Sequence, residues 1–230
     1  DEQNVTRILS YLDENPKIKL RSIFSHLAAS PEAEHDDFTR EQIFKFERIS
    51  EKIKKHFTYP IMLHILNTSG IERFPEYQYD MVRLGLGLYG IGFTPESKRK
   101  LIQAGTLKTV ISQIKLIHEG DSVGYSRAFR ADKDMKIATL PIGYADGLMR
   151  TLGNGGGKVF INGHFAPFVS NICMDMAMVD ITDIQCEEGD EVILFGENLP
   201  VEEFAKDMKT IPYEVLTHIS RRVKRVYFQD

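Results

Sequence analysis

The sequence predicts a chain with an α/β part followed by a part built mainly of β-strands. In the first part, segments with helical spacing alternate with short apolar runs, which is typical of parallel βα units. In the second part the helical spacing fades, and short β-rich runs alternate with turn residues. Between them, Phe93–Lys98 contains proline and small polar residues, which indicate a linker. We therefore expect two domains, residues 1–94 and 95–230.

The composition fits a globular protein and excludes several classes. The chain has 230 residues, 42% of them hydrophobic, which is enough for an ordinary core. Its formal net charge of -4 argues against nucleic acid as the main partner, because phosphate-binding surfaces are strongly basic. No run of about 18 apolar residues is present, so we expect no membrane-spanning helix. Cys173 and Cys186 are too few for a disulfide scaffold or a zinc site, so the cytoplasm is the expected location.

Two long helices are predicted in the first part. Near its start, four apolar residues follow the i, i+3, i+4, i+7 spacing of an amphipathic helix: Val5, Ile8, Leu9 and Leu12. Thr39 and Gln42 have capping-box spacing and predict the start of a second helix. The apolar face of that helix is marked by Phe38, Phe46, Ile49, Ile53 and Phe57.

Three strands are predicted between and after these helices. They are Lys17–Leu27, Pro60–Asn67 and Met81–Tyr89. The second is a nearly continuous apolar run bounded by turn signals, which fits a strand buried on both faces. Three parallel strands are too few for a closed barrel, since an eight-stranded barrel needs about 250 residues.

The second part is predicted to be an antiparallel, barrel-like β-domain. Its strand-like runs are Val110–Ile117, Ile137–Leu140, Val159–Ile161 and Glu191–Phe195. The third leads into Asn162-Gly163, a strong signal for a two-residue hairpin. Two helices, Val201–Met208 and Tyr213–Ser220, are expected near the end.

Polar side chains stand at or near the expected C-terminal ends of the parallel strands, where ligands bind in α/β folds. They are His26, His64, Asn67 and Arg83. A histidine at a strand end is more often a hydrogen-bonded structural residue, but a buried guanidinium needs partners or a ligand. Gly85 and Gly87 allow the close backbone approach that a phosphate site needs, or they serve only packing.

The second part offers a further set of candidates. Tyr125 lies in the turn Asp121–Arg127, and Tyr144 lies in Pro141–Gly147. Cys173 and Met174 follow in a later segment. Their alternative roles are core packing for Cys173 and Met174 and a structural hydrogen bond for either tyrosine. These residues alone indicate a small-molecule site and no particular reaction.

Taken together, these segments resemble the alanine racemases, pyridoxal-phosphate enzymes with a TIM barrel followed by a β-domain. The resemblance rests on Ser25–Ala28, His64–Thr68, Met81–Gly90, Val123–Tyr125, Pro141–Gly147, Ile172–Met176, Tyr213–Thr217 and Ser220–Val223. It covers nearly the whole chain in the family's order. It implies the last βα units of the barrel plus the β-domain, in a cytoplasmic homodimer that interconverts L- and D-alanine for peptidoglycan synthesis.

The family's opening strand carries a lysine in a Val-x-Lys-Ala-x-Ala-Tyr-Gly-His-Gly context, and no lysine here has those neighbours. In the family that lysine holds the cofactor as a Schiff base and serves as one of two bases. We therefore expect that this chain, which starts at Asp1, is a C-terminal portion and is inactive alone. Arg221 stands where some members have a tyrosine that touches the cofactor phosphate, so that contact is not carried over to it.

The resemblance implies catalytic roles for three residues. Tyr125 matches the second base, supplied across a dimer interface to the partner's barrel, and His26 matches the histidine that contacts it. A tyrosine acts as a base near neutral pH only beside positive charge or hydrogen-bond donors. Arg83 matches the arginine that faces the pyridine nitrogen of pyridoxal 5'-phosphate, and His64 matches its supporting neighbour. An arginine there leaves that nitrogen mostly unprotonated and limits side reactions.

Further positions match cofactor- and substrate-binding residues. The expected cofactor-binding set is His64, Asn67, Thr68, Arg83, Gly85 and Leu86. Met174 matches the residue whose backbone amide binds the substrate carboxylate, and Tyr144 and Asp175 match residues that line the way into the site. Two alternatives stay open: a racemase for serine or another small amino acid, and a non-catalytic binding or dimerisation module.

Overall fold

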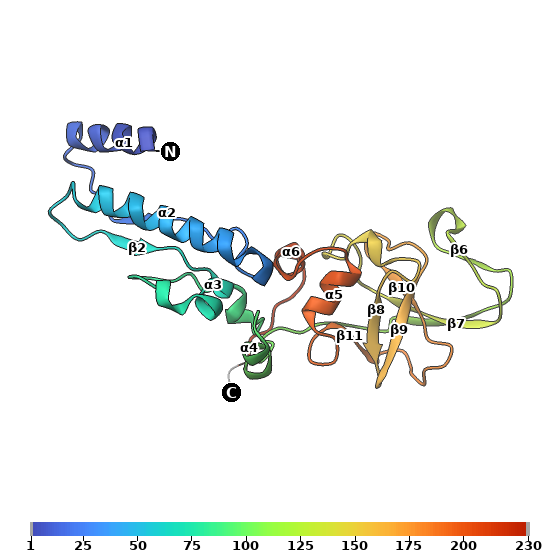
Figure 1. The fold of residues 1–230 in the computed structure, drawn as a ribbon. Helices are drawn as coiled ribbons and strands as arrows, with labels where there is room; N and C mark the ends of the chain where they lie inside the picture. Colours follow the sequence, from blue (N-terminus) through green and yellow to red (C-terminus); the bar gives the residue numbers. More distant parts are fainter. Residues whose placement is uncertain (1, 229–230) are drawn as a thin grey trace. The chain divides into compact units, whose positions relative to one another are not determined.

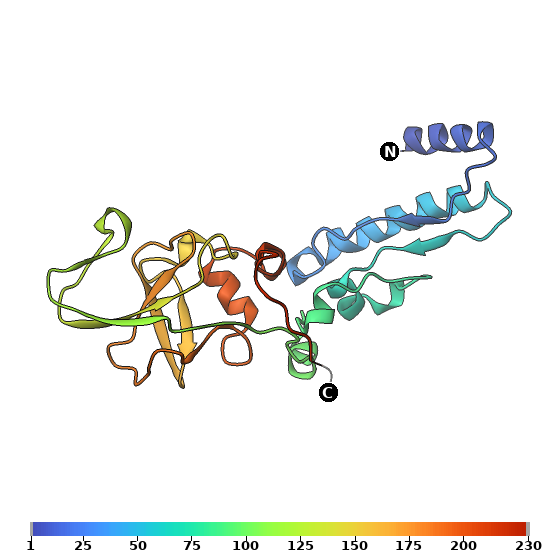
Figure 2. The ribbon, with the colours of Figure 1, turned by 180° about the vertical axis from the view of Figure 1, so that it is seen from behind.

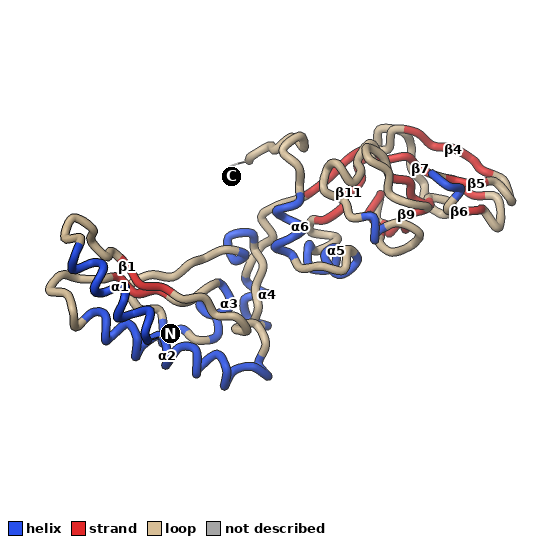
Figure 3. Tube along the Cα trace, turned by 90° about the horizontal axis from the view of Figure 1, so that it is seen from above, coloured by secondary structure: helices blue, strands red, loops and turns tan. Residues whose placement is uncertain are grey.

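The computed structural model describes residues 2–228 and contains two compact units, divided between Ala104 and Gly105. Figure 1 and Figure 2 trace the chain from α1 to α6. Figure 3 shows that the first unit is mostly helix and loop and that most strands belong to the second unit, as the sequence predicts. The domain boundary between residues 94 and 95 stays a prediction.

The core of the first unit forms around one long helix. This helix, α2 (Asp36–Lys54), buries Ile43 and Phe46 among the apolar residues of the strand ends. The shorter α1 (Glu2–Glu14) buries Val5 and Leu9 and contacts α2, as its spacing predicts. The predicted capping box is wrong, because α2 already begins three residues before Thr39.

Two parallel strands lie beside α2, and both are shorter than predicted. β1 (Ser22–Phe24) pairs with β2 (Met62–His64) so that Phe24 is opposite His64. The charged stretch before β1 does not extend the sheet, since the Leu20 amide donates to the Tyr59 hydroxyl instead of to a strand. Met62 is 42% exposed, so β2 is not buried on both faces.

The third predicted strand, Met81–Tyr89, is not a strand. Residues 81–85 form a loop, and 86–89 form the 3-10 turn η3 (Leu86–Tyr89). Gly85 has φ -116 and ψ -94, which no strand residue adopts, and Gly90 at φ 80 ends the turn. The loop still follows the end of β2, because the Arg83 amide donates to the Leu66 carbonyl at 2.9 Å.

Short helical elements complete the first unit. They are η1 (Ala33–His35), α3 (Thr68–Arg73), η2 (Pro75–Tyr77) and α4 (Pro95–Lys100). The last falls in the predicted linker, where Thr94 and Ser97 form a capping box that starts a helix. No helix in the described part of the chain is long and apolar enough to cross a membrane.

The second unit is built on a seven-stranded antiparallel sheet with the order β3-β11-β8-β9-β10-β7-β4. Its strands are β3 (Leu107–Val110), β4 (Gln113–Ile117), β7 (Met135–Leu140), β8 (Lys158–Ile161), β9 (His164–Val169), β10 (Ala177–Asp180) and β11 (Glu191–Phe195). The predicted Asn162-Gly163 hairpin is confirmed: both residues have positive φ and join β8 to β9.

This sheet is strongly curled. β3 and β4 stand at opposite ends of the strand order, yet only Ile111 and Ser112 separate them in the sequence. Two residues span at most about 10 Å, so the sheet must bend until its two ends lie close together. The barrel-like prediction is confirmed in this sense, although no β3–β4 ladder closes the sheet among the described residues.

Smaller elements surround the sheet. A separate hairpin of β5 (Ser122–Val123) and β6 (Phe129–Arg130) encloses the turn η4 (Tyr125–Arg127), and η5 (Arg150–Leu152) precedes β8. The predicted helices near the end are confirmed as α5 (Val201–Asp207) and α6 (Pro212–His218). Phe204 of α5 is fully buried against Phe195 of β11.

Candidate active site

Arg83 is the centre of a polar cluster at the C-terminal ends of β1 and β2. Its Nη1 lies 2.6 Å from His64 Nδ1 and donates to the His64 carbonyl at 3.4 Å. Its Nη2 donates to the carbonyls of Ser25 at 2.6 Å and Ile65 at 3.2 Å, and lies 3.3 Å from His26 Nδ1. The structure therefore brings together the three candidates His26, His64 and Arg83.

The surroundings of this cluster fix the protonation states of His64 and Arg83. His64 is buried, and both burial and the Arg83 charge lower its pKa, so the imidazole is neutral near pH 7. Burial also lowers the pKa of Arg83, but a guanidinium keeps its protons in proteins. Nδ1 of neutral His64 accepts the Arg83 hydrogen bond, and the cluster holds a permanent cation.

The local sequence explains why these groups meet. The β1–β2 register sets Phe24 beside His64, and their rings stack with centroids 5.3 Å apart. The Arg83 guanidinium lies over the same Phe24 ring, 5.5 Å from its centroid. The Gln42 side chain, from α2, bonds the His26 carbonyl and the Ala28 amide and holds the loop after β1. Sequence reasoning missed Phe24 and gave Gln42 only the capping role that proved wrong, since an aromatic strand residue and a helix glutamine carry no functional signal by themselves.

Thr68 connects the next two candidates. Its buried Oγ1 accepts hydrogen bonds from the Gly85 amide at 3.0 Å and the Gly87 amide at 3.3 Å. Its own hydroxyl proton remains to be donated. A Cβ on Gly87 would press on the side chains of Leu84 and Thr68, so glycine leaves the most room for this approach. Leu86 lies buried between the two glycines, at the start of η3.

Asn67 has a structural task in this arrangement. Its Oδ1 caps α3 by accepting from the Gly70 amide at 3.0 Å. The same atom lies 2.9 Å from the Ser30 hydroxyl and 3.1 Å from the Ser69 hydroxyl. These two hydroxyls also bond each other at 2.6 Å, so one of them donates to the other and the second donates to Oδ1. The predicted cofactor contact of Asn67 stays a prediction.

Tyr125 lies in the second unit, on the tip of the β5–β6 hairpin. Its side chain is 75% exposed. Gly124, Ser126 and Arg127 around it all have positive φ, between 52° and 77°. Two of these are residues with a Cβ, which rarely adopt that region. The backbone is thus forced into a tight turn that presents the tyrosine outward.

Tyr144 and Met174 lie on two loops that are bonded to each other. The Tyr144 amide donates to the Cys173 carbonyl, and the Ala145 amide donates to the Met174 carbonyl, both at 3.0 Å. A Cβ on Gly143 would collide with the same two carbonyls, so the loops touch closely there. Met174 is 53% exposed, which rules out core packing as its role.

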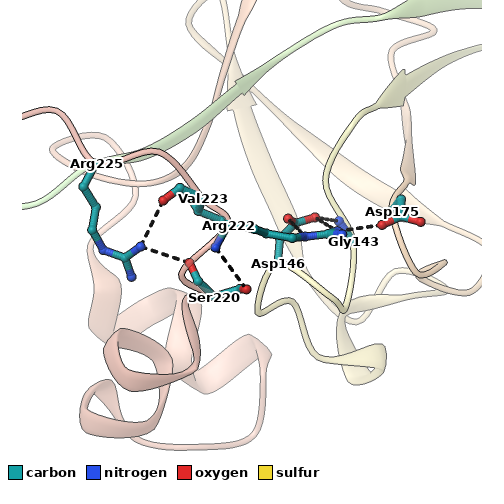
Figure 4. Close-up of polar contacts among 7 residues, drawn as sticks. All are labelled: Gly143, Asp146, Asp175, Ser220, Arg222, Val223 and Arg225. Carbon is teal, nitrogen blue, oxygen red and sulfur yellow. Dashed lines mark hydrogen bonds and ion pairs between the residues drawn. The ribbon is translucent and has the colours of Figure 1, made fainter.

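An arginine that the sequence did not single out fixes both loops (Figure 4). Arg222 donates Nε to Asp146 Oδ1 at 2.6 Å and Nη2 to Asp146 Oδ2 at 2.9 Å. Its Nη2 also donates to Asp175 Oδ1 at 2.6 Å, and Asp146 Oδ2 accepts the Gly143 amide at 2.8 Å. We call Arg222, Asp146 and Asp175 the arginine clamp. Burial opposes ionisation of Asp146, but the bonds from Arg222 and Gly143 hold its pKa below the usual value.

The predicted residues are divided between the two units. His26, His64, Asn67, Thr68, Arg83, Gly85 and Leu86 belong to the first, and Tyr125, Tyr144, Met174 and Asp175 belong to the second. Asp146 and Arg222 lie within segments that carried the resemblance, Pro141–Gly147 and Ser220–Val223. Their pairing spans 76 positions of sequence, and no spacing rule could have joined them.

Two family models match the chain. One is described as alanine racemase, C-terminal domain, and matches residues 104–227. The other is described as alanine racemase, N-terminal domain, and matches residues 1–93. Alanine racemase 2 of Caldanaerobacter subterraneus subsp. tengcongensis is 40% identical over 91% of this chain and 55% of its own length. The alanine racemase of Clostridium tetani is 38% identical over 100% of this chain and 61% of its own.

Solved structures agree with the sequence comparison. Alanine racemase from Bartonella henselae with covalently bound pyridoxal phosphate has a TM-score of 0.83 at 34% identity, over 96% of this chain and 61% of that one. Alanine racemase from Clostridium difficile in complex with cycloserine has a TM-score of 0.84 at 37% identity, over 97% and 60%. The chain thus spans about three fifths of the length of these relatives.

Proposed function

Because this chain belongs to the alanine racemase family, we propose that it forms the C-terminal part of an enzyme that interconverts L- and D-alanine. The observation that carries the proposal is the Arg83 cluster. A half-buried cation is held by two imidazoles and three carbonyls at the edge where an α/β fold binds its ligand. A module that only bound or dimerised would have no need for such a group.

The first unit has the donors that pyridoxal 5'-phosphate needs. Thr68 has a hydroxyl proton to give to a phosphate oxygen, and Gly85 and Leu86 place backbone beside it. Arg83 can direct a guanidinium N–H toward a ring nitrogen. When bound, the cofactor stabilises negative charge at the substrate α-carbon. Thr68, Gly85, Leu86 and Arg83 therefore fit pyridoxal phosphate, which is covalently bound in the Bartonella henselae structure.

Arg83 would set how strongly the cofactor withdraws negative charge from the substrate α-carbon. Since a guanidinium does not give up its proton, Arg83 donates a hydrogen bond to the ring nitrogen and leaves it without a proton of its own. His64 keeps the guanidinium in this orientation through the 2.6 Å bond to its Nδ1. We infer that the arrangement favours return of the α-proton over side reactions such as transamination.

Racemisation needs a base on each face of the α-carbon, because the proton leaves one face and returns to the other. We assign one face to Tyr125, whose exposed hydroxyl can reach into the site of a partner subunit. His26 would contact that hydroxyl. The base on the second face would be a lysine upstream of Asp1. Because Tyr125 would serve the site of a partner subunit, this proposal also implies a homodimer.

The two bonded loops of the second unit would bind the substrate. The Met174 backbone amide donates to the alanine carboxylate, and Tyr144 and Asp175 line the way in. The arginine clamp keeps these loops together. The product fits cytoplasmic supply of D-alanine for peptidoglycan synthesis.

The test compares the 230-residue chain with an extended enzyme that includes the upstream coding sequence. Each is incubated with pyridoxal phosphate, reduced with borohydride, mapped for labelled lysine and assayed for D-alanine and D-serine. We expect one labelled lysine and D-alanine formation in the extended enzyme only. A stoichiometrically labelled lysine and activity in the chain alone, or an inactive extended enzyme without a lysine motif, would overturn the proposal. Faster turnover of serine than of alanine would show that serine is the preferred substrate.

A further inference from the structure

A serine directly behind the Tyr125 hairpin has an unusual backbone. Ser170 follows the last residue of β9, is fully buried and has φ 62. Residues with a Cβ rarely adopt this region, and they keep such a conformation only where surrounding contacts hold them in it, often at functional sites. Its position is well anchored, because Val169 pairs with Met178 of β10 and the Ser170 carbonyl accepts from the Asn154 amide at 2.8 Å.

The backbone conformation of Ser170 places its hydroxyl group in a hydrogen bond. Ser170 Oγ donates to the Val123 carbonyl at 2.8 Å, across 47 positions of sequence. Val123 ends β5, two residues before Tyr125. Gly124 lies directly on the hydroxyl, since a Cβ at Gly124 would collide with Ser170 Oγ. The left-handed serine and the left-handed glycine thus fit together just before the tyrosine.

Besides the packing of Val123 and Phe129 against the apolar core of the sheet, the hairpin has few contacts that hold its shape. β5 and β6 pair over only two residues each. The Arg127 side chain bonds Ser122, but that contact stays within the hairpin. Among the described residues, the Ser170 hydroxyl makes the hydrogen bond that connects residues 122–128 to the seven-stranded sheet.

We propose that Ser170 is a positioning residue for Tyr125, fixing the turn from which the tyrosine reaches its substrate. This inference rests on the proposed function of Tyr125 as a base. A base must lie within hydrogen-bond reach of the proton that it takes, and small displacements reduce the rate strongly. Ser170 itself touches neither substrate nor cofactor in this proposal.

The structural half of the proposal is tested in the 230-residue chain by hydrogen–deuterium exchange. Ser170→Ala removes the hydroxyl and keeps the backbone strain, whereas Ser170→Gly removes the hydroxyl and relieves the strain. Loss of one hydrogen bond should speed exchange in peptides covering 121–129 by about two- to tenfold in both variants. Ser112→Ala is the matched control, because Ser112 Oγ also donates to a backbone carbonyl of the sheet, that of Thr139, at 2.9 Å.

Exchange that is unchanged in both variants, or faster only in Ser170→Ala, would show that strain or packing holds the turn and would overturn the proposal. In the extended enzyme, Ser170→Ala should lower kcat for α-proton exchange of L-alanine with little change in KM. It should cause no further loss in a Tyr125→Phe background. Normal kcat in Ser170→Ala beside an impaired Tyr125→Phe overturns the positioning role alone. A fully active Tyr125→Phe would overturn the proposed function itself, whatever the exchange data show.

Discussion

Each unit of this protein has one arginine that joins some of its functional candidates, but the two arginines have opposite partners. Arg83 binds two imidazoles and three carbonyls, and no carboxylate in residues 2–228 pairs with it. Arg222 binds two carboxylates through three hydrogen bonds. The charge of Arg222 is therefore neutralised by the protein's own aspartates, whereas the charge of Arg83 has no counter-charge among its partners.

This difference separates two ways of using the same side chain. A guanidinium that is oriented by neutral acceptors and partly buried keeps its field, because no counter-charge cancels it. A guanidinium shared by two aspartates holds loops together and contributes little field beyond them. We therefore assign chemistry to Arg83 in the first unit and to Tyr125 in the second, and we assign loop architecture to Arg222.

The largest effect is expected from Tyr125→Phe in the extended enzyme. The change removes only the phenolic oxygen of an exposed side chain, so folding and cofactor binding should change little. Exchange of the α-proton of L-alanine should fall by about 10²–10⁴-fold, the usual range for a lost general base. The lysine on the other face should still exchange the proton of D-alanine.

Deuterium wash-in followed by NMR measures the two enantiomers separately. Tyr11→Phe, on exposed α1, serves as the matched control. Equal loss for both enantiomers, or racemisation near the wild-type rate, would show that Tyr125 is not a face-specific base.

A second large effect is expected from Arg83→Gln, which removes the uncancelled cation. Loss of one preorganised donor typically lowers kcat by about 10²–10³-fold. Arg83→Lys keeps the charge but cannot reproduce the planar fork that reaches five acceptors, so its activity should fall between those of the wild type and Arg83→Gln. Racemisation rates and pyridoxal phosphate affinity measure the effect, with Arg99→Gln, on the exposed end of α4, as control. If glutamine and lysine are equally impaired, geometry and not charge is the contribution of Arg83.

The sequence predicted the first arginine and not the second, for a physical reason. Arg83 stands in an apolar, glycine-rich segment, where an ionised group needs an explanation. Arg222 stands among charged residues near the C-terminus, where a cation looks like ordinary surface. Local signals such as the Asn162-Gly163 turn were read correctly, because they depend on neighbouring residues alone. The segment 81–89 was misread because its apolar character outweighed the two glycines that bend it.

The clamp should affect stability more than the chemistry. Asp146→Asn keeps the shape of the side chain but removes the charge and turns an amide toward Arg222. We expect the free energy of unfolding to fall by about 1.5–3 kcal/mol, as for a hydrogen bond to a charged group. Asp175→Asn is the matched control at the exposed end of the clamp, where an ion pair contributes about 0–1 kcal/mol. Urea unfolding of the 230-residue chain measures both, and equal losses would contradict the assignment of Asp146 as the buried anchor.

The smallest effect concerns pH and distinguishes the two clusters by their titration windows. Burial and the Arg83 charge lower the pKa of His64 below its ordinary 6.5, so the unfolded chain binds more protons there and stability falls as the pH drops through about 6.5. The lowered pKa of Asp146 acts over a more acidic pH range. Its contribution to stability is complete above the ordinary pKa of 3.8 and is lost as the pH falls below that value. The wild type should therefore exceed His64→Gln in urea midpoint by an amount that decreases between pH 7.5 and about 5.5. The difference in urea midpoint between the wild type and Asp146→Asn should stay level over that range and decrease only below about pH 4. A His64 difference that is flat across the first window would mean that burial and the Arg83 charge do not hold the imidazole neutral, and the contrast between an uncancelled and a cancelled cation would lose its support.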